Sequence, residues 1–385
     1  MAATVYIIRH AEAEGNIYRR CHGLYDSLLT PRAYQQLPCL AKRFENVPLA
    51  AVYASPLFRA RTTAQAVAAP HGLTVELRND LHEIDMGDWE DLPWAELPHG
   101  WPDQYAKWCA RPWEAAPPHG ETVMQAGARM LNEVCRLAQE NDGKAIAVVT
   151  HGSAIRGALT IAHGFPPEKM NEIGWGDNTC VARLDFADDG SIDVVYENDA
   201  SHLPQELSTF ACIGWKNAKG IPLSPQIWFR RADPNNPQDV DKIVEFMREL
   251  HRNAYGTDEG LDPAALLRDV ERAQQVSPRT FGMLEDGTPA ALVYLKTWYD
   301  EEPDVGLLGG FCISSEYRGC GLSAQILGQA ISVYRSLGKT WLCAHVAEKN
   351  LRAQGFYRKF AFEHRGEHRD ANGLHYRMFK RLTAE

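Results

Sequence analysis

Short apolar runs alternate with amphipathic stretches through the first half of the chain. β-Branched and aromatic runs predict strands at residues 4–8, 50–53 and 145–150. Apolar residues recur at helical spacing in residues 57–68 and 122–138. Ser153, just after the third run, is expected to cap the following helix. This alternation, with continuously apolar strands, predicts an α/β fold with a mainly parallel sheet.

Two further strands are expected at residues 179–186 and 192–196, on either side of an Asp-Asp-Gly turn. The segment 216–225 (KNAKGIPLSP) has two prolines and a glycine but few large apolar residues, which predicts a linker. We therefore expect a first domain over residues 1–215, a linker over 216–225 and a second domain over 226–385.

The pattern restarts beyond the linker. A short strand is predicted at residues 227–230, followed by a helix whose apolar face carries Val240, Ile243, Val244, Met247 and Leu250. Runs of strand character then follow one another directly, as in an antiparallel meander. These runs are residues 280–284, 290–297 and 307–313.

Length and composition narrow the class of protein. A chain of 385 residues favours two domains at roughly 100–200 residues each. The net charge of −10 disfavours nonspecific binding to nucleic acid or an anionic membrane. The nine cysteines are scattered, without a C-x-x-C pair, so no zinc or other metal site is expected. No segment approaches the ~18 apolar residues of a membrane span, and a cytoplasmic location is predicted.

Residues 92–118 interrupt the alternation with a segment rich in proline that holds four tryptophans. Two interpretations stay open at this point. The segment is either an irregular, well-packed excursion or a lid over a site, since long loops beside a sheet often carry substrate contacts.

Two histidines occupy equivalent places after predicted strands. Arg9 and His10 follow the first strand directly, and His151 follows the run at residues 145–150. In a doubly wound sheet, ligands bind at the carboxyl ends of the strands, so these side chains can converge on one point. A strand-end histidine beside cationic groups is a candidate nucleophile or phosphate ligand.

Arg59 and Glu83 are weaker candidates when each is taken alone. Arg59 begins a predicted helix in SPLFRARTTA, where an arginine is ordinarily solvated. Glu83 lies in LHEIDMGDWED beside Met86 and Trp89, and a carboxyl in an aromatic-lined pocket can serve as a proton donor. An ordinary surface carboxylate is the simpler interpretation.

Several motifs occur together and in order across the first 205 residues. They are RHAEAEGN from Arg9, GLYDSLLTPRAYQ from Gly23, SPLFRARTTA from Ser55, HEIDMGDWE from His82, HGET from His119, VVTHG before Ser153, and NDASHL from Asn198. This set resembles the histidine phosphatase superfamily, which includes cofactor-dependent phosphoglycerate mutase. The resemblance implies a three-layer α/β/α fold.

The same resemblance implies a mechanism through a phosphorylated histidine. His10 would attack phosphorus and carry the phosphoryl group for part of the cycle. Glu83 would protonate the leaving oxygen and then take a proton from water. No metal or cofactor is needed, because cationic groups supply the charge. The side chains that would hold the phosphoryl oxygens are Arg9, Asn16, Arg59 and His151.

Three residues depart from the family pattern at positions where glycine is usual: Ala11, Ala33 and Asp91. Ala11 narrows the backbone freedom beside His10, because only glycine is indifferent to positive φ. None of the three is a predicted catalytic side chain. We predict a phosphatase, which transfers the phosphoryl group to water. The alternative is a mutase, which returns the phosphoryl group to a bound product.

A second group of motifs lies near the C-terminus. YRGCGLS, residues 317–323, connects a strand-like run to a predicted helix, so its backbone N–H groups can face an anion. NLRAQGFYRKFAF begins at Asn350 and places Tyr357 on a helix. Together they resemble the GNAT acetyltransferase family, over about residues 227–385. That resemblance implies an α/β fold with a mixed, mostly antiparallel sheet.

Acetyl-CoA is the cofactor that this second resemblance implies. Tyr357 would protonate the departing thiolate, and Asn350 would contact the cofactor arm. The backbone of a splayed strand would bind the pantetheine arm of the cofactor, and the glycine-rich loop would bind the cofactor's pyrophosphate. These two elements correspond to Phe311, Cys312, Ile313, Arg318, Gly319, Gly321 and Ser323. Ser323 stands where the family usually has glycine or alanine, and Ala361 stands where it usually has glycine. Glu285, Asp304 and Glu316 are equally weak candidates for the general base that would activate the acceptor.

The combined interpretation is a bifunctional enzyme that hydrolyses a small phosphate ester and N-acetylates a small amine. The alternative for the second half is a sensor that binds acyl-CoA without turnover. Nucleic acid and membrane are not expected partners, and the sequence makes no prediction of the oligomeric state.

Overall fold

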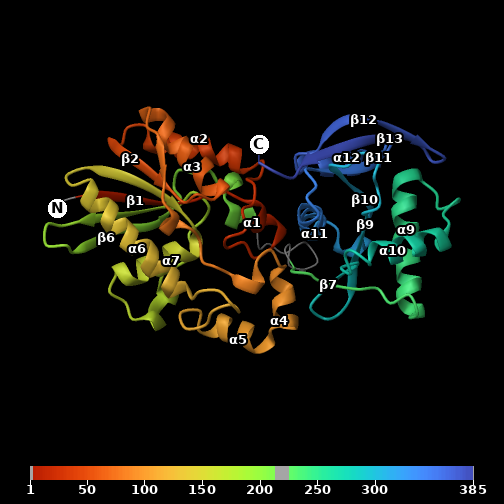
Figure 1. Ribbon diagram of the computed structural model, residues 1–385. Coiled ribbons are helices and arrows are strands. Elements are labelled where there is room, and N and C mark those ends of the chain that lie inside the picture. Colours follow the sequence, from red (N-terminus) through yellow and green to blue (C-terminus); the bar gives the residue numbers. More distant parts are fainter. Residues whose placement is uncertain (1–2, 213–224, 385) are drawn as a thin grey trace. The chain divides into compact units, whose positions relative to one another are not determined.

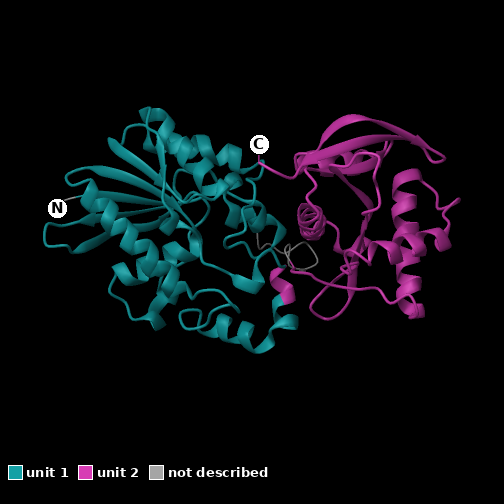
Figure 2. Cartoon of the chain, viewed as in Figure 1, with its two compact units in different colours: residues 1–92, 97–214 teal, residues 93–96, 215–385 magenta. Residues whose placement is uncertain are grey.

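The computed structural model describes residues 3–212 and 225–384, which form two compact units. The first unit comprises residues 1–92 and 97–214, and the second comprises residues 93–96 and 215–385 (Figure 2). All of the predicted linker except Pro225 lies outside the described residues. Residues 93–96, within the tryptophan-rich segment, group with the second unit rather than the first. The exact domain boundaries therefore stay a prediction.

The first unit is built on a six-stranded sheet in the order β3-β2-β4-β1-β5-β6 (Figure 1). β1, β2, β3 and β4 pair in parallel, and β5 and β6 add an antiparallel edge. The strands are β1 (Ala3–Arg9), β2 (Leu49–Ala54), β3 (Val75–Leu77), β4 (Ala145–Thr150), β5 (Val181–Phe186) and β6 (Ile192–Asp199). The helices are α1 (Glu14–Tyr18), α2 (Ala33–Phe44), α3 (Phe58–Ala68), α4 (Leu97–Gly100), α5 (Pro102–Ala110), α6 (Val123–Glu140), α7 (Gly152–Ala162) and α8 (Thr209–Cys212).

Helices cover both faces of this sheet, with α2 and α3 on one side and α6 and α7 on the other (Figure 1). Side chains alternate between the faces of a strand, so one set of strand residues packs under α2 and α3. This cluster includes Val52 of β2, Val149 of β4, Phe44 of α2 and Val67 of α3, all buried. The predicted three-layer α/β/α fold is confirmed.

The pairing of β1 with β4 decides where the two histidines go. Arg9 is opposite Thr150 in a parallel register, and the N–H of His10 donates to the Thr150 carbonyl at 3.0 Å. His10 and His151 therefore leave neighbouring strands at the same edge of the sheet, where such folds bind ligands.

Helix α7 begins directly at this edge, with His151 rather than Ser153 as its N-cap. The expected serine cap is wrong by two residues. The free N–H groups of Ser153 and Ala154 donate to the Glu83 carboxylate at 3.1 and 3.0 Å. A side chain from a distant segment thus satisfies the first turn of the helix, a partnership that no local pattern reveals.

The tryptophan-rich segment contains α4 and α5, and aromatic side chains of this segment pack against Trp89. Trp101, the N-cap of α5, and Tyr105 and Trp108 within it contact the buried ring of Trp89, with centroid distances of 5.8–6.4 Å. No residue of α5 is itself buried. The well-packed interpretation is supported by these contacts, and the role of a lid stays a prediction.

Helices α6 and α7 approach closely at Gly127 and Gly157. A Cβ atom on Gly127 would lie 2.3 Å from the carbonyl carbon of Gly157, and backbone cannot swing aside. Gly127→Ala should therefore lower the free energy of unfolding by about 1–3 kcal/mol. Urea denaturation of the first unit, followed by tryptophan fluorescence, measures the loss. Gly100→Ala is the matched control, because its added methyl would meet nothing within 4 Å; equal losses in both variants would contradict the helix-contact explanation.

The second unit has a seven-stranded sheet in the order β12-β13-β11-β10-β9-β8-β7. Among residues 225–384, only β10 and β11 pair in parallel, which confirms the mixed, mostly antiparallel sheet. The strands are β7 (Trp228–Arg230), β8 (Phe281–Met283), β9 (Pro289–Lys296), β10 (Val305–Ile313), β11 (Trp341–Ala347), β12 (Glu363–Asp370) and β13 (Gly373–Arg381). The helices are α9 (Pro237–Tyr255), α10 (Pro263–Ala273), α11 (Leu322–Ser336) and α12 (Leu351–Lys359).

Two apolar contacts hold the second sheet to its helices. Phe246 of α9 and Val270 of α10 pack against Phe281 and Leu292 on strands β8 and β9. Tyr334 of α11 packs over Gly306, where a Cβ would come within 2.3 Å of the ring. The glycine at that strand position is thus required for the helix to approach.

Candidate active sites

His10 lies at the end of β1, where its surroundings keep the imidazole neutral. Its side chain is buried, and Nδ1 donates to the Ala11 carbonyl at 2.7 Å, because a carbonyl can only accept. The proton is thereby assigned to Nδ1, and Nε2 keeps a lone pair. Burial, then the charges of Arg59 and Arg9, lower the pKa of His10 well below its usual value. The imidazole is therefore uncharged at neutral pH.

This environment predicts the titration of His10. Because the pKa in the folded state is depressed, the ring should stay neutral as the pH falls from 7.5 to about 5, below the ~6.5 at which a free histidine protonates. NMR of ¹⁵N-histidine-labelled protein, with the His10 signal assigned by its absence in His10→Ala, checks this. Protonation of His10 near the pKa of free histidine would contradict it.

His151 faces the same point from the end of β4. The ring centroids of His10 and His151 are 5.1 Å apart. His151 is fully buried, and neither ring nitrogen has a hydrogen-bond partner among the described residues. Burial, then Arg59 and His10, lower its pKa well below the usual value. A buried unpaired donor costs about 1–3 kcal/mol, so a ligand that accepts from it is expected at this position.

Arg59 and Arg9 supply positive charge beside the two rings. Arg59 is 1% exposed, and its guanidinium donates to the carbonyls of Tyr25 and Gly23 at 2.8 and 2.7 Å. These bonds fix the orientation of the group but use part of its donor capacity. Arg9 donates to the Gly176 carbonyl at 2.5 Å, and its Nε is buried without a partner among the described residues.

Two asparagines complete the surroundings of His10. The Asn16 side-chain oxygen accepts from the Ala13 N–H at 2.9 Å, which leaves its amide N–H groups for another acceptor. Asn178 donates from Nδ2 to the His10 carbonyl at 2.9 Å. Asn178 was not predicted from the sequence, because it lies in a loop before β5 with no motif that points to it.

Glu83 is held by polar backbone groups rather than by aromatic rings. Its carboxylate accepts from the N–H groups of Ser153, Ala154 and Ile84 at 2.9–3.1 Å and is 7% exposed. The simpler interpretation of Glu83 as a surface carboxylate is therefore wrong. The N–H groups of Ser153 and Ala154 belong to the first turn of α7, directly after its N-cap His151, and they hold the Glu83 carboxylate in place.

The departures from glycine near this site have separate explanations. Ala11 has no positive φ, so alanine fits beside His10. Asp91 adopts φ 55°, a conformation that aspartate tolerates better than most residues. Its carboxylate accepts from Arg20 at 2.7 Å and lies 3.0 Å from His22 Nε2.

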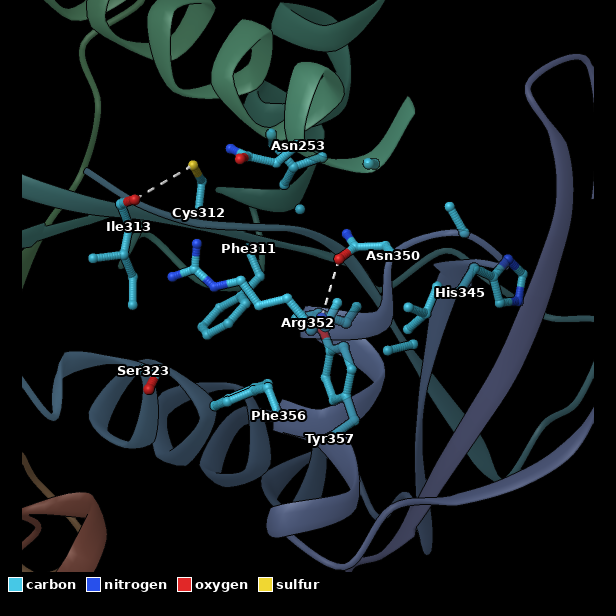
Figure 3. Close-up of a pocket in the computed structure, with 18 of the residues that line it drawn as sticks. Asn253, Phe311, Cys312, Ile313, Ser323, His345, Asn350, Arg352, Phe356 and Tyr357 are labelled. Atoms are coloured by element: carbon cyan, nitrogen blue, oxygen red, sulfur yellow. Dashed lines mark hydrogen bonds between the residues drawn. The ribbon is translucent and has the colours of Figure 1, made fainter. Parts of the chain in front are cut away.

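The second unit contains a cavity of about 260 Å³ where β10 and β11 separate. The two strands pair from Val305 to Leu308, and β10 then continues along β9 while β11 continues along β13. The cavity is lined by residues 309–313 of β10 and 344–347 of β11 (Figure 3). Backbone groups that face the gap have no strand partner there, which suits them to bind an amide-bearing chain.

The glycine-rich loop lies at one end of this cavity. Gly319 and Gly321 have φ near +80°, and Gly321 is the N-cap of α11. The loop therefore directs backbone N–H groups outward at a helix N-terminus, an arrangement that favours an anion. Arg318 lines the cavity too, but it donates to the Ile313 carbonyl at 3.1 Å and forms an ion pair with Glu249. The positive charge of Arg318 is thus partly neutralised by Glu249 of α9.

Several of the predicted side chains line the same cavity. Phe311, Cys312, Asn350 and Tyr357 all line it (Figure 3). Asn350 also caps α12 by accepting from the Ala353 N–H at 3.0 Å. The hydroxyl of Tyr357 has no hydrogen-bond partner in the described chain, and burial raises its pKa. Burial also raises the pKa of Cys312 to about 12, so this thiol packs as a neutral group.

None of the three candidates for the general base reaches this cavity. Glu285, Asp304 and Glu316 are absent from its described lining, which instead includes Tyr255 of α9 and His345 of β11. Sequence reasoning missed both residues. Tyr255 ends a long amphipathic helix and His345 lies inside a strand, and neither position carries a motif.

Two kinds of feature are absent from residues 3–212 and 225–384. Within those ranges no helix combines the length and apolar character needed to cross a membrane. The same residues contain no group of three or more histidine, cysteine, aspartate or glutamate side chains placed to hold a metal ion.

Comparison with known proteins agrees with the two-part organisation. Residues 5–199 match the histidine phosphatase superfamily (branch 1), and residues 244–362 match the acetyltransferase (GNAT) family. The chain is 29% identical to an Escherichia coli protein named adenosylcobalamin/alpha-ribazole phosphatase over 166 residues, 43% of this chain and 82% of that protein. It is 31% identical to phosphoglycerate mutase-like protein 4 of Arabidopsis thaliana over 206 residues, 53% of this chain and 88% of that protein.

The structure of Bacillus stearothermophilus YhfR superposes on the first unit with a TM-score of 0.50 and 30% identity, covering 52% of this chain and 98% of YhfR. Both resemblances read from the motifs are thereby confirmed at the level of the family. The chain belongs to the histidine phosphatase superfamily, branch 1, and carries a GNAT acetyltransferase domain in its second half.

Proposed function

We propose that the first unit hydrolyses phosphate monoesters through a phosphohistidine at His10. The observation that carries this proposal is the pairing of a free His10 Nε2 with the unpartnered ring nitrogens of His151, both beside the guanidinium groups of Arg59 and Arg9. Such an arrangement suits a phosphoryl group, whose oxygens accept hydrogen bonds and carry negative charge. The relatives include a protein named as a phosphatase.

The chemistry follows from the positions of these groups. His10 Nε2 attacks phosphorus while the ester P–O bond breaks, and Glu83 provides the proton for the leaving oxygen. Arg9, Arg59 and His151 counter the charge on the phosphoryl oxygens. Water then attacks phosphorus with Glu83 as the base, which releases phosphate and restores His10.

A mutase is the second candidate, because one relative is named mutase-like. It differs in returning the phosphoryl group to a bound product. Incubation with 2- and 3-phosphoglycerate separates the two candidates: interconversion without release of phosphate would favour the mutase.

We propose that the second unit transfers an acetyl group from acetyl-CoA to an amine. The splayed strands fit the pantetheine arm, the Gly319–Gly321 turn fits the pyrophosphate, and the free Tyr357 hydroxyl fits a thiol. The cofactor would supply the activated acetyl group. Tyr357 keeps its proton at neutral pH because its pKa is raised, and it can give that proton to the departing sulfur.

Two assays on the full chain test the two proposals separately. Rapid quenching during turnover of a ³²P-labelled aryl phosphate should trap an acid-labile, base-stable phosphoryl group on the protein. Acetyl-CoA with a panel of primary amines should release thiol, measured with a thiol reagent. No trapped phosphoryl group would overturn the first proposal; acetyl-CoA binding without thiol release would leave the sensor as the function of the second unit.

A further inference from the structure

A hydrogen-bonded tyrosine and histidine border the cavity of the second unit. Tyr255, the last residue of α9, lines the cavity, and its hydroxyl is 2.8 Å from Nε2 of His375 on β13. His375 is 3% exposed, so this contact is sheltered from water. None of the roles assigned above uses either residue.

The surroundings of His375 define the direction of the hydrogen bond. Its Nδ1 is buried and lies 3.6 Å from the Asp370 carboxylate, a distance that allows attraction but not a hydrogen bond. That negative charge favours the proton on Nδ1, which leaves Nε2 as an acceptor. The Tyr255 hydroxyl therefore donates to Nε2, and its oxygen lone pairs remain available to another donor.

An acceptor amine needs such a group. A primary amine is largely protonated at neutral pH and cannot attack a thioester until it loses a proton. Burial, then the nearby Asp370, raise the pKa of Tyr255, so its hydroxyl stays protonated at neutral pH and no phenolate is present to act as a base by itself. With His375 behind it, the hydroxyl can take one proton while it gives up another.

We propose that Tyr255 is the group that deprotonates the acceptor amine, and that His375 positions it and receives its proton. The inference rests on the proposed acetyl transfer and adds the residue that sequence reasoning did not find. The acceptor class it implies is a primary amine that arrives as the ammonium form.

The proton balance is complete within these residues. The ammonium N–H bond breaks and a proton passes to the Tyr255 oxygen, while the Tyr255 proton passes to His375 Nε2. The resulting imidazolium lies beside the Asp370 carboxylate. Asp370 is 40% exposed, so water screens it and its own contribution is small.

Other ionisable side chains pack around the pair and have to be considered in any pH profile. The His251 ring lies tilted against that of Tyr255, with ring centroids 4.5 Å apart, and its Nδ1 donates to the Thr257 carbonyl at 2.8 Å. The ring centroid of His368 on β12 lies 6.3 Å from that of His375, and the His368 ring stacks on His345 of β11. His345 also lines the cavity, and its pKa is lowered to about 4 by burial and then by His368, so it stays neutral in the working range (Figure 3).

The test compares Tyr255→Phe and His375→Gln with the full-length wild type. Steady-state acetyl transfer is measured by thiol release with benzylamine, spermidine and hydroxylamine as probes, and acetyl-CoA binding by calorimetry. Both variants should lose about 100-fold in kcat with benzylamine or spermidine. The affinity for acetyl-CoA should stay unchanged, which shows that the cavity is intact. Tyr299→Phe is the matched control, since its hydroxyl contacts Glu301 outside the cavity lining and its loss should leave kcat unchanged.

Two readouts separate proton transfer from a structural effect. Activity of both variants should recover as the pH is raised until the amine is mostly unprotonated, and the loss should be much smaller with hydroxylamine, which is unprotonated at neutral pH. Full kcat in Tyr255→Phe, or a loss that is equal for all amines and pH values, would overturn the relay while acetyl transfer stands. Acetyl-CoA binding without thiol release by the wild type would overturn acetyl transfer itself.

Discussion

His10→Ala is expected to lose phosphatase activity by about 10⁴-fold or more, because it removes the atom that forms the bond to phosphorus. The fold should survive, since His10 is a strand-end residue whose Nδ1 contacts only the adjacent carbonyl. Hydrolysis of 4-nitrophenyl phosphate measures the loss. The same preparation should bind acetyl-CoA with unchanged affinity, because the cofactor cavity belongs to the other unit.

His71→Ala is the matched control for this variant. His71 lies at the end of the helix after α3 and contacts the Phe44 carbonyl at 3.0 Å, away from the histidine pair. It should keep wild-type turnover. Hydrolysis by His10→Ala within about tenfold of wild type, or a trapped phosphoryl group in that variant, would show that another residue is the nucleophile.

Glu83→Gln should have an effect that depends on the leaving group. With an alkyl phosphate such as glycerol 2-phosphate, the leaving oxygen needs a proton, and the loss should reach about 10²–10³-fold. With 4-nitrophenyl phosphate, whose leaving group is stable as an anion, the loss should be much smaller. The ratio of the two rates therefore reports proton donation rather than damage to the site.

A structural effect of this variant is separable from the chemical one. Glutamine can still accept from one N–H at the start of α7, but its amide group cannot replace both carboxylate oxygens at Ser153 and Ala154. Vanadate binding to the variant measures whether the anion site persists. Glu76→Gln, at an exposed position on β3, is the control. Equal losses on both substrates would assign the proton to another group.

Local patterns were sufficient for much of the fold. The strands at residues 4–8, 50–53 and 145–150 lie within β1, β2 and β4, and the helix at 122–138 coincides with α6 apart from its N-cap Thr122, because strand and helix periodicities are properties of short segments. The placement of Arg9, His10 and His151 also followed from chain order, since parallel strands end at one edge. The splay of β10 from β11 was available only through the family resemblance.

Other parts of both sites depended on contacts between segments far apart in the chain. The prediction of a serine cap on α7 failed because Glu83, some 70 residues earlier, occupies that place. The contact between Tyr255 and His375 spans 120 residues and joins a helix end to a strand interior, two positions that carry no motif.

The sequence alone therefore determined the two families, the order of the elements and the side chains to which the proposed phosphatase chemistry is assigned, since each of these is recorded in residues close together in the chain. The tertiary structure decided the protonation of His10, the polar anchoring of Glu83 and the pairing of Tyr255 with His375. Burial and hydrogen bonding set those properties, and both depend on which distant segments the fold brings into contact.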